Sequence, residues 1–368
     1  MTDRPGRRGY LDWMRGLAVV IMVGWHTLDA WTTPVDKASG AFWYCQLIGG
    51  FGAPIFLFLA GVSVSLACAS RLRKLPADAS PWAAAWPMVK RGGWIWVLAI
   101  LFRIQSDVLG GRTTLGQLLV LDIVRGNTLK VDILNVMGPA IAGAAMLWGL
   151  ARTAGWRLAG STIAACAFAF LTPGIRAWTA LDALPDGVEG YLRPFAGRTT
   201  FSFFPWAGFV FAGAAIGVLV DRTRDVLSER RLIVWFAIGG GALWVGSLIA
   251  AYGPALFGPS DFWRTAPSFF FMRVGVLVTG IAACYLWEAR PRLLGTQPFS
   301  PVRQFGVTSL FIYWIHVEMA YGGLSRPIKG QLPLPWSLLA FLLFLGAMLV
   351  VSVVKTAIAD RWRPRRAS

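Results

Sequence analysis

The chain has 368 residues, of which 56% are hydrophobic and 14% are charged. Its apolar residues fall in blocks of about 20 residues, long enough to cross a bilayer, so the class of ordinary soluble proteins is excluded. The net charge of +17 is of the size found in nucleic-acid-binding proteins, but most lysines and arginines flank the apolar blocks, which favours a role in membrane topology and no nucleic-acid partner.

The apolar blocks predict an all-α fold, a polytopic membrane helix bundle that has the lipid bilayer as its surroundings. We expect about ten transmembrane helices with both termini cytoplasmic, because this topology leaves most basic residues on the cytoplasmic side. Residues 1–368 are interpreted as a single integral-membrane domain. The predicted spans lie near residues 11–31, 47–68, 93–108, 133–151, 157–173, 203–220, 232–251, 268–287, 307–323 and 334–357.

The first predicted span, Tyr10–Trp31, carries four ionisable residues along one stripe: Asp12, Arg15, His26 and Asp29. On an ideal helix Arg15 and His26 are offset by about 20° around the axis and lie about 16 Å apart along it. Asp12 and Asp29 fall within about 60° of the same line. Ionisable side chains inside a span are costly and usually face the protein interior or a wet cavity. This segment therefore predicts one wall of a polar site within the membrane.

The following segments contain several departures from regular spans. The Gly52-Ala53-Pro54 step reflects either close helix packing or a break of the second span beside a ligand. Ser80–Trp96 predicts an interfacial helix that enters the third span. An apolar run in the outer segment Arg103–Asp132 is too short to span, so we expect it to be re-entrant or on the surface. That segment and Pro173–Ser202 are candidates for a lid or an acceptor-binding rim.

Two histidines, His26 and His316, both lie in predicted spans and are the candidate general bases. Asp29 follows His26 by one turn and is expected to orient it, as a carboxylate does in a catalytic triad. Glu318 is less well placed, because a spacing of two residues points side chains to different faces of a helix. The alternative for either histidine is a hydrogen bond between packed helices.

Other polar residues are expected either at the same depth in the membrane as the two histidines or at the cytoplasmic end of the polar stripe. Asn135 and Arg273, together with Glu318, are the candidate substrate-binding residues. Arg15, with Asp12, is the candidate clamp for a phosphate or carbonyl group of a donor, since guanidinium suits such anions. The alternative for Arg15 is an anchor whose charge snorkels toward the headgroups. The four cysteines are scattered without ligand spacing, so we expect neither a metal nor a disulfide framework.

These motifs resemble those of transmembrane acyltransferases. The segment Leu11-Asp12-x-x-Arg15-Gly16-Leu17, followed by His26, is similar to the first span of acyltransferase family 3, including its arginine–histidine spacing. The arginine pair that this family carries in its third span is not evident in Ile95–Arg103. The rest is similar to the bacterial relatives of heparan-α-glucosaminide N-acetyltransferase in the segments Gly52–Gly61, Val131–Gly138, Phe204–Phe209 and Tyr313–Glu318.

The resemblance implies an acyltransferase in a bacterial cytoplasmic (inner) membrane. Such an enzyme takes an acetyl group from cytosolic acetyl-CoA and passes it to an amine or hydroxyl of a glycan or small molecule on the outer side. A histidine acts as base on the acceptor or carries the acetyl group transiently. From the residues alone, a transporter for a small polar solute and a non-catalytic partner in glycan export are the alternatives. Neither the acceptor nor the oligomeric state follows from the sequence.

Overall fold

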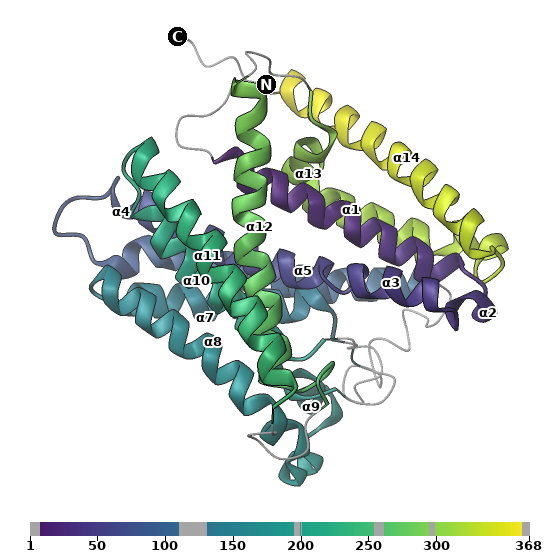
Figure 1. Ribbon diagram of the computed structural model, residues 1–368, viewed down its shortest axis with the longest axis horizontal. Coiled ribbons are helices and arrows are strands. Elements are labelled where there is room, and N and C mark those ends of the chain that lie inside the picture. Colours follow the sequence, from purple (N-terminus) through teal and green to yellow (C-terminus); the bar gives the residue numbers. More distant parts are fainter. Residues whose placement is uncertain are drawn as a thin grey trace. The chain divides into compact units, whose positions relative to one another are not determined.

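The computed structural model describes residues 8–109, 131–194, 199, 201–253, 261–293 and 299–362. Over these residues the predicted all-α fold is confirmed: the chain forms α-helices and two short 3₁₀ helices, with only isolated β-bridges (Figure 1). The α-helices are α1 (Gly9–Trp31), α2 (Pro34–Lys37), α3 (Gly40–Gly49), α4 (Gly52–Leu72), α5 (Pro81–Leu109), α7 (Ile133–Leu150), α8 (Ala154–Ala177), α9 (Asp186–Leu192), α10 (Phe203–Asp221), α11 (Val226–Ala251), α12 (Pro267–Leu293), α13 (Pro301–Tyr321) and α14 (Leu334–Arg361).

Each predicted span coincides with one of the long helices, and the chain is an integral membrane protein. In the described part of the chain, seven helical segments are long and apolar enough to cross a membrane. Helices α1, α5 and α13 are not among the seven, and each carries ionisable residues along its length. A count of about ten spans and the cytoplasmic placement of the termini therefore stay predictions.

Several predicted boundaries differ from the structure. The second span is interrupted between Gly49 and Gly52, just before the step that we expected as a possible break. Pro54 lies in the first turn of α4, where a missing N–H costs no hydrogen bond. The helix expected over Ser80–Trp96 does enter the third span, because both form the continuous helix α5; its place at the membrane interface stays a prediction. The apolar run expected to be re-entrant or on the outer surface lies outside the described residues.

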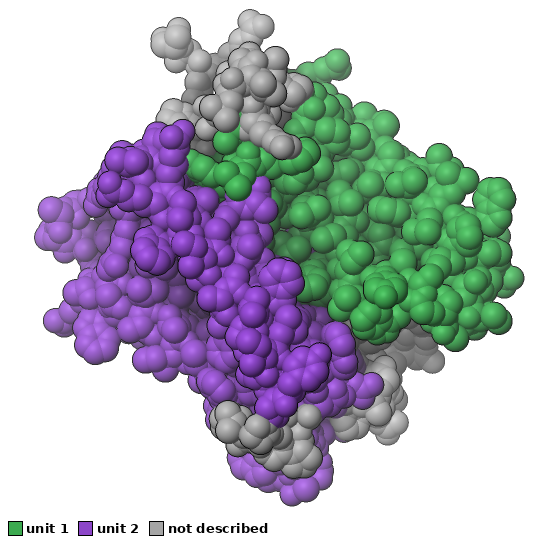
Figure 2. Space-filling view, in the orientation of Figure 1, with its two compact units in different colours: residues 1–55, 284–368 green, residues 56–283 purple. Residues whose placement is uncertain are grey.

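The chain divides into two compact units, which Figure 2 distinguishes by colour. Unit 1 comprises residues 1–55 and 284–368, and unit 2 comprises residues 56–283. Whether residues 1–368 act as one acyltransferase domain stays a prediction.

In unit 1, α1 packs against α13 and α14, which come from the other end of the chain (Figure 1). The α1–α13 crossing is very close, because Gly16 faces the backbone of Val302 and Gly306 faces the backbone of Asp12. A Cβ atom at either glycine would overlap a carbonyl oxygen of the opposite helix. Small residues are used in this way where membrane helices approach each other closely.

A buried polar network fixes α13 against α14. The side chain of Gln304 donates to the carbonyl oxygen of Ser352 at 3.0 Å and to the Thr356 hydroxyl at 2.8 Å. The hydroxyls of Thr308 and Ser352 lie 2.6 Å apart. Thr308 has non-helical backbone angles (φ −110°, ψ 15°), so α13 is kinked there. These bonds satisfy polar groups that would otherwise be costly to bury.

Unit 2 is built on two pairs of neighbouring helices, α5 with α7 and α8 with α10. Helix α10 also contacts α7, α9 and α11. The Ser65 hydroxyl of α4 donates to the carbonyl oxygen of Ala214 in α10 at 2.8 Å. A 3₁₀ helix (Thr179–Ala183) and the short α-helix α9 follow α8 in the predicted outer segment.

The close α1–α13 crossing leads to a testable prediction. Replacing Gly306 by Ala should lower the free energy of unfolding by about 1–3 kcal/mol, because the added methyl group must push α1 and α13 apart. Thermal unfolding of the purified protein in detergent measures the effect. Gly346→Ala is the matched control, since its Cβ would enter open space on α14 and should not destabilise. Equal stability of both variants would contradict the close crossing.

Candidate functional site

Unit 1 brings the two histidines together. His26 of α1 and His316 of α13 are 290 residues apart in the chain, yet Nδ1 of His26 lies 2.8 Å from Nε2 of His316. Their ring planes are within 4° of parallel, and the ring centroids are 5.1 Å apart. A separation of 2.8 Å is a hydrogen-bond distance, so one of the two nitrogens donates a proton to the other.

His316 is held on its far side by its own helix. Its Nδ1 lies 2.8 Å from the carbonyl oxygen of Ile312, one turn earlier in α13. The side chain of His316 is completely buried, whereas His26 is partly buried. Of the two imidazoles, His26 is therefore the one with surface available to another molecule.

A small polar cluster lies at the end of α1 beyond His26. The hydroxyl of Tyr321 donates to Oδ2 of Asp29 at 2.8 Å, and the Tyr321 ring meets the His26 ring edge-on at 5.4 Å. The ammonium group of Lys37 lies 3.7 Å from Oδ1 of Asp29 and also donates to the Asp29 carbonyl oxygen. Asp29 and Lys37 are each about one-third exposed or more, so water screens this ion pair.

These contacts differ from the expected hydrogen bond between Asp29 and His26. In the structure Nδ1 of His26 is hydrogen-bonded to His316. The carboxylate of Asp29 accepts a hydrogen bond from Tyr321 and forms an ion pair with Lys37. The physical reason is that α13 presents both a ring nitrogen and a phenol to this face of α1. Tyr321, which sequence reasoning did not single out, is the link between Asp29 and the His26 ring.

At the other end of the stripe, Arg15 and Asp12 are paired with each other. Nη1 of Arg15 lies 3.0 Å from Oδ1 of Asp12. The Asp12 side chain is 6% exposed and that of Arg15 is 26% exposed, so the carboxylate supports a guanidinium that partly reaches the surface. Nearby along α1, the indole of Trp13 donates to the Ser300 hydroxyl at 3.1 Å. Glu318, the third acidic candidate of unit 1, is partly buried on α13.

Asn135, one of the candidate substrate-binding residues, lies in unit 2 and has structural partners. Its side-chain oxygen accepts from the backbone N–H of Asp132 at 3.1 Å and thereby caps α7. Its amide donates to the Tyr191 hydroxyl at 3.3 Å, and the same hydroxyl accepts from the indole of Trp96 at 2.8 Å. Asp132 in turn forms an ion pair with Arg103 at 3.0 Å. Asn135 thus joins α7 to α5 and α9 through Tyr191.

Arg273, the other candidate of unit 2, lies among aromatic rings. Its guanidinium carbon is 4.1 Å from the ring centroid of Phe269 and 5.8 Å from that of Trp206. A guanidinium held over aromatic faces in this way is stabilised by cation–π attraction. The structure therefore connects α12 to α10 through Arg273 and leaves its assignment to substrate binding a prediction.

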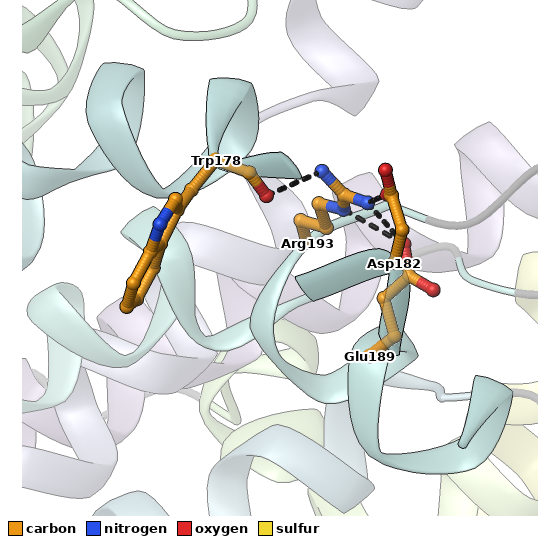
Figure 3. A network of polar contacts seen from close by, with 4 residues as sticks. All are labelled: Trp178, Asp182, Glu189 and Arg193. Atoms are coloured by element: carbon orange, nitrogen blue, oxygen red, sulfur yellow. Dashed lines mark hydrogen bonds and ion pairs between the residues drawn. The ribbon is translucent and has the colours of Figure 1, made fainter. Parts of the chain in front are cut away.

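The predicted outer segment of unit 2 contains a network centred on Arg193. Its guanidinium donates to Glu189 at 2.7 Å and to the carbonyl oxygen of Trp178 at 3.1 Å, and it also meets Asp182 (Figure 3). The hydrogen bonds to Glu189 and then to Asp182 raise the pKa of Arg193, so the guanidinium stays charged. This network ties the end of α9 back to the turn after α8, within the segment that is a candidate for a lid or an acceptor-binding rim.

Comparison with known proteins places the first part of the chain in a functional context. Residues 8–104 match the family model described as an acyltransferase domain, that of acyltransferase family 3. The matched segment is about a quarter of the chain and contains the whole polar stripe of α1, including Arg15 and His26. No curated protein matches the chain. The match supports a membrane acyltransferase and the expected resemblance of the first span to this family.

The contacts of Asn135 lead to a prediction that separates its structural role from substrate binding. Asn135→Ala should lower the free energy of unfolding by about 1 kcal/mol, because α7 loses a cap and Tyr191 loses a donor. Tyr191→Phe keeps the cap and should cost less. Thermal unfolding of both variants measures the difference, and an unchanged stability of Asn135→Ala would contradict the structural role.

Proposed function

We propose that this protein transfers an acetyl group from cytosolic acetyl-CoA to an amine or hydroxyl of a glycan or small molecule on the opposite side of the membrane. The proposal adds a donor and an acceptor class to the acyltransferase that the family match supports. The observation that carries it is the match over residues 8–104, which includes the Arg15–His26 stripe. Resemblance of Val131–Gly138 and Tyr313–Glu318 to bacterial relatives of heparan-α-glucosaminide N-acetyltransferase supports the glycan acceptor.

In the proposed reaction His26 acts as the general base. Its imidazole accepts the proton of the acceptor O–H or N–H while the acceptor heteroatom attacks the thioester carbonyl carbon. The new C–O or C–N bond forms as the C–S bond breaks, and the departing sulfur takes up a proton to give CoA with a free thiol. General-base catalysis of this kind contributes typically about 10²- to 10⁴-fold to the rate. Transfer of the acetyl group to His26 first is the two-step version of the same chemistry.

Arg15 is proposed to bind the donor near the cytosolic end of the stripe. Acetyl-CoA carries phosphate groups and a thioester carbonyl, all of which accept hydrogen bonds from guanidinium. The ion pair with Asp12 at 3.0 Å orients the guanidinium without burying it, because the Arg15 side chain keeps 26% of its surface exposed. Asp12 is thus proposed to act through Arg15.

On the acceptor side we propose a role for the polar cluster of Asp29, Tyr321 and Lys37. The Tyr321 phenol bridges the Asp29 carboxylate and the edge of the His26 ring. A sugar hydroxyl or amine that approaches His26 from this end would meet hydrogen-bonding groups of both polarities. Glu318, Asn135 and Arg273 stay candidate substrate-binding residues. Arg193 and its acidic partners are candidates for the outer rim.

The test of this function is an acetyl-transfer assay on the purified protein reconstituted in liposomes. With labelled acetyl-CoA and a panel of amino sugars and neutral sugars, we expect release of CoA and a labelled acceptor. His26→Ala should lower turnover by about 100-fold or more, since the general base is lost. Val20→Ala, a partly buried residue of the same helix, is the control and should retain activity. Full activity of His26→Ala, or uptake of solute without CoA release, would contradict the proposal.

The donor site has its own prediction. Arg15→Gln should raise KM for acetyl-CoA roughly tenfold or more, because a charge-assisted hydrogen bond of about 1.5–3 kcal/mol is lost. Initial-rate kinetics at varied acetyl-CoA measure this change. Arg361→Gln, an exposed arginine in the last turn of α14, is the matched control. A donor KM that is the same for both variants would sink the assignment of Arg15.

A further inference from the structure

We infer that His316 is a positioning residue that fixes the tautomer of His26, so that Nε2 of His26 is the atom that accepts the proton. The role of His26 as a base rests on the proposed function, whereas the protonation pattern of the two rings follows from their geometry. Three groups form a hydrogen-bonded row: the Ile312 carbonyl, the His316 imidazole and the His26 imidazole.

The contact with Ile312 determines which nitrogen of His316 carries the proton. A backbone carbonyl oxygen can only accept a hydrogen bond. Since Nδ1 of His316 lies 2.8 Å from the Ile312 oxygen, Nδ1 must carry the proton and donate it. A neutral imidazole has one N–H, so Nε2 of His316 then holds a lone pair.

The lone pair of His316 in turn determines which nitrogen of His26 carries the proton. Nδ1 of His26 lies 2.8 Å from the lone pair on Nε2 of His316. Two lone pairs at that distance would repel, so Nδ1 of His26 carries a proton and donates it. Nε2 of a neutral His26 consequently has the free lone pair of the ring. Both histidines are thus Nδ1–H tautomers, and the chain of donors runs from His26 through His316 to the carbonyl.

This arrangement explains why a base here needs no carboxylate behind it. In a membrane-embedded site an ionised carboxylate is costly to bury. The neutral imidazole of His316 costs less, because both of its nitrogens are hydrogen-bonded. His316 is completely buried, so water does not compete for its bonds. When His26 takes up a proton at Nε2, its Nδ1–H bond to His316 becomes charge-assisted and stronger. His316 therefore holds the base in orientation and stabilises its protonated form.

A role limited to helix packing makes different predictions. If the His26–His316 bond only joined α1 to α13, any contact of similar strength could replace it. Turnover would then not depend on which nitrogen of His26 carries the proton. A positioning role requires an acceptor at residue 316. His316→Asn supplies an oxygen that can accept from His26, while His316→Ala supplies none.

Nitrogen NMR of the protein labelled with ¹⁵N-histidine tests the inference, because the chain contains only two histidines. At neutral pH both rings should show a protonated Nδ1 and an unprotonated Nε2. In His316→Ala the His26 signals should shift toward the Nε2–H form, and turnover should fall by about 10- to 1,000-fold with little change in KM for acetyl-CoA. His316→Asn should recover a substantial part of both properties. Thermal unfolding of each variant identifies a folding defect.

The NMR and turnover measurements distinguish a failure of the inference from a failure of the proposed function. A His26 ring protonated at Nε2 in the unaltered protein would overturn the inference even if acetyl transfer is observed. A His316→Ala variant that folds and keeps both the Nδ1–H tautomer and full turnover would overturn it as well. If the tautomers are as stated but no acyl transfer occurs with any acceptor, the proposed function fails while the assignment of protons stands.

Discussion

The geometry of the candidate site depends on the hydrogen bond between His26 and His316. Polar side chains within an apolar helix bundle cost free energy unless their hydrogen bonds are satisfied. Here Nδ1 of His26 is hydrogen-bonded to Nε2 of His316, and Nδ1 of His316 is hydrogen-bonded to the Ile312 carbonyl oxygen. The pair is therefore stable in a medium that would penalise a charge, and one nitrogen of His26 remains for chemistry.

The surrounding helices serve to keep this bond at 2.8 Å. Gly16 and Gly306 allow α1 and α13, the two helices that carry the histidines, to touch through their backbones. Thr308, at the kink of α13, is hydrogen-bonded to Ser352 and lies about two turns before His316. A change in the register of either helix would move a ring nitrogen out of hydrogen-bond range. Packing residues far from any substrate thus contribute to the geometry of the site.

Much of the fold could be predicted from the sequence, because apolar blocks long enough to cross a bilayer become helices with few alternatives. The sequence left the Gly52-Ala53-Pro54 step open as either close helix packing or a break, and the structure has the helix interrupted just before it, between Gly49 and Gly52. The polar stripe of α1 was also visible, because helical periodicity alone shows that Arg15 and His26 share a face. Local periodicity of this kind is reliable within one helix.

The partners across helices could not be predicted in the same way. No local pattern indicates that α1 packs against α13, so Asp29 was the natural expected partner of His26 at one helical turn. The structure instead pairs His26 with His316 and Asp29 with Tyr321. Tyr321 gave no distinct signal, because a tyrosine near the end of a span is commonly an interfacial anchor. Tertiary contacts decide the site, and they carry little trace in a single sequence.

If His316 acts through His26, the two histidines contribute to turnover as one unit, and a double-mutant cycle on acetyl-transfer turnover tests this coupling. Groups that act as a unit have strongly non-additive effects on rate. We predict that the double variant His26→Ala/His316→Ala is no slower than His26→Ala alone, because His316 acts only through His26. Losses that multiply, so that the double variant is slower by the product of the two single effects, would contradict the account.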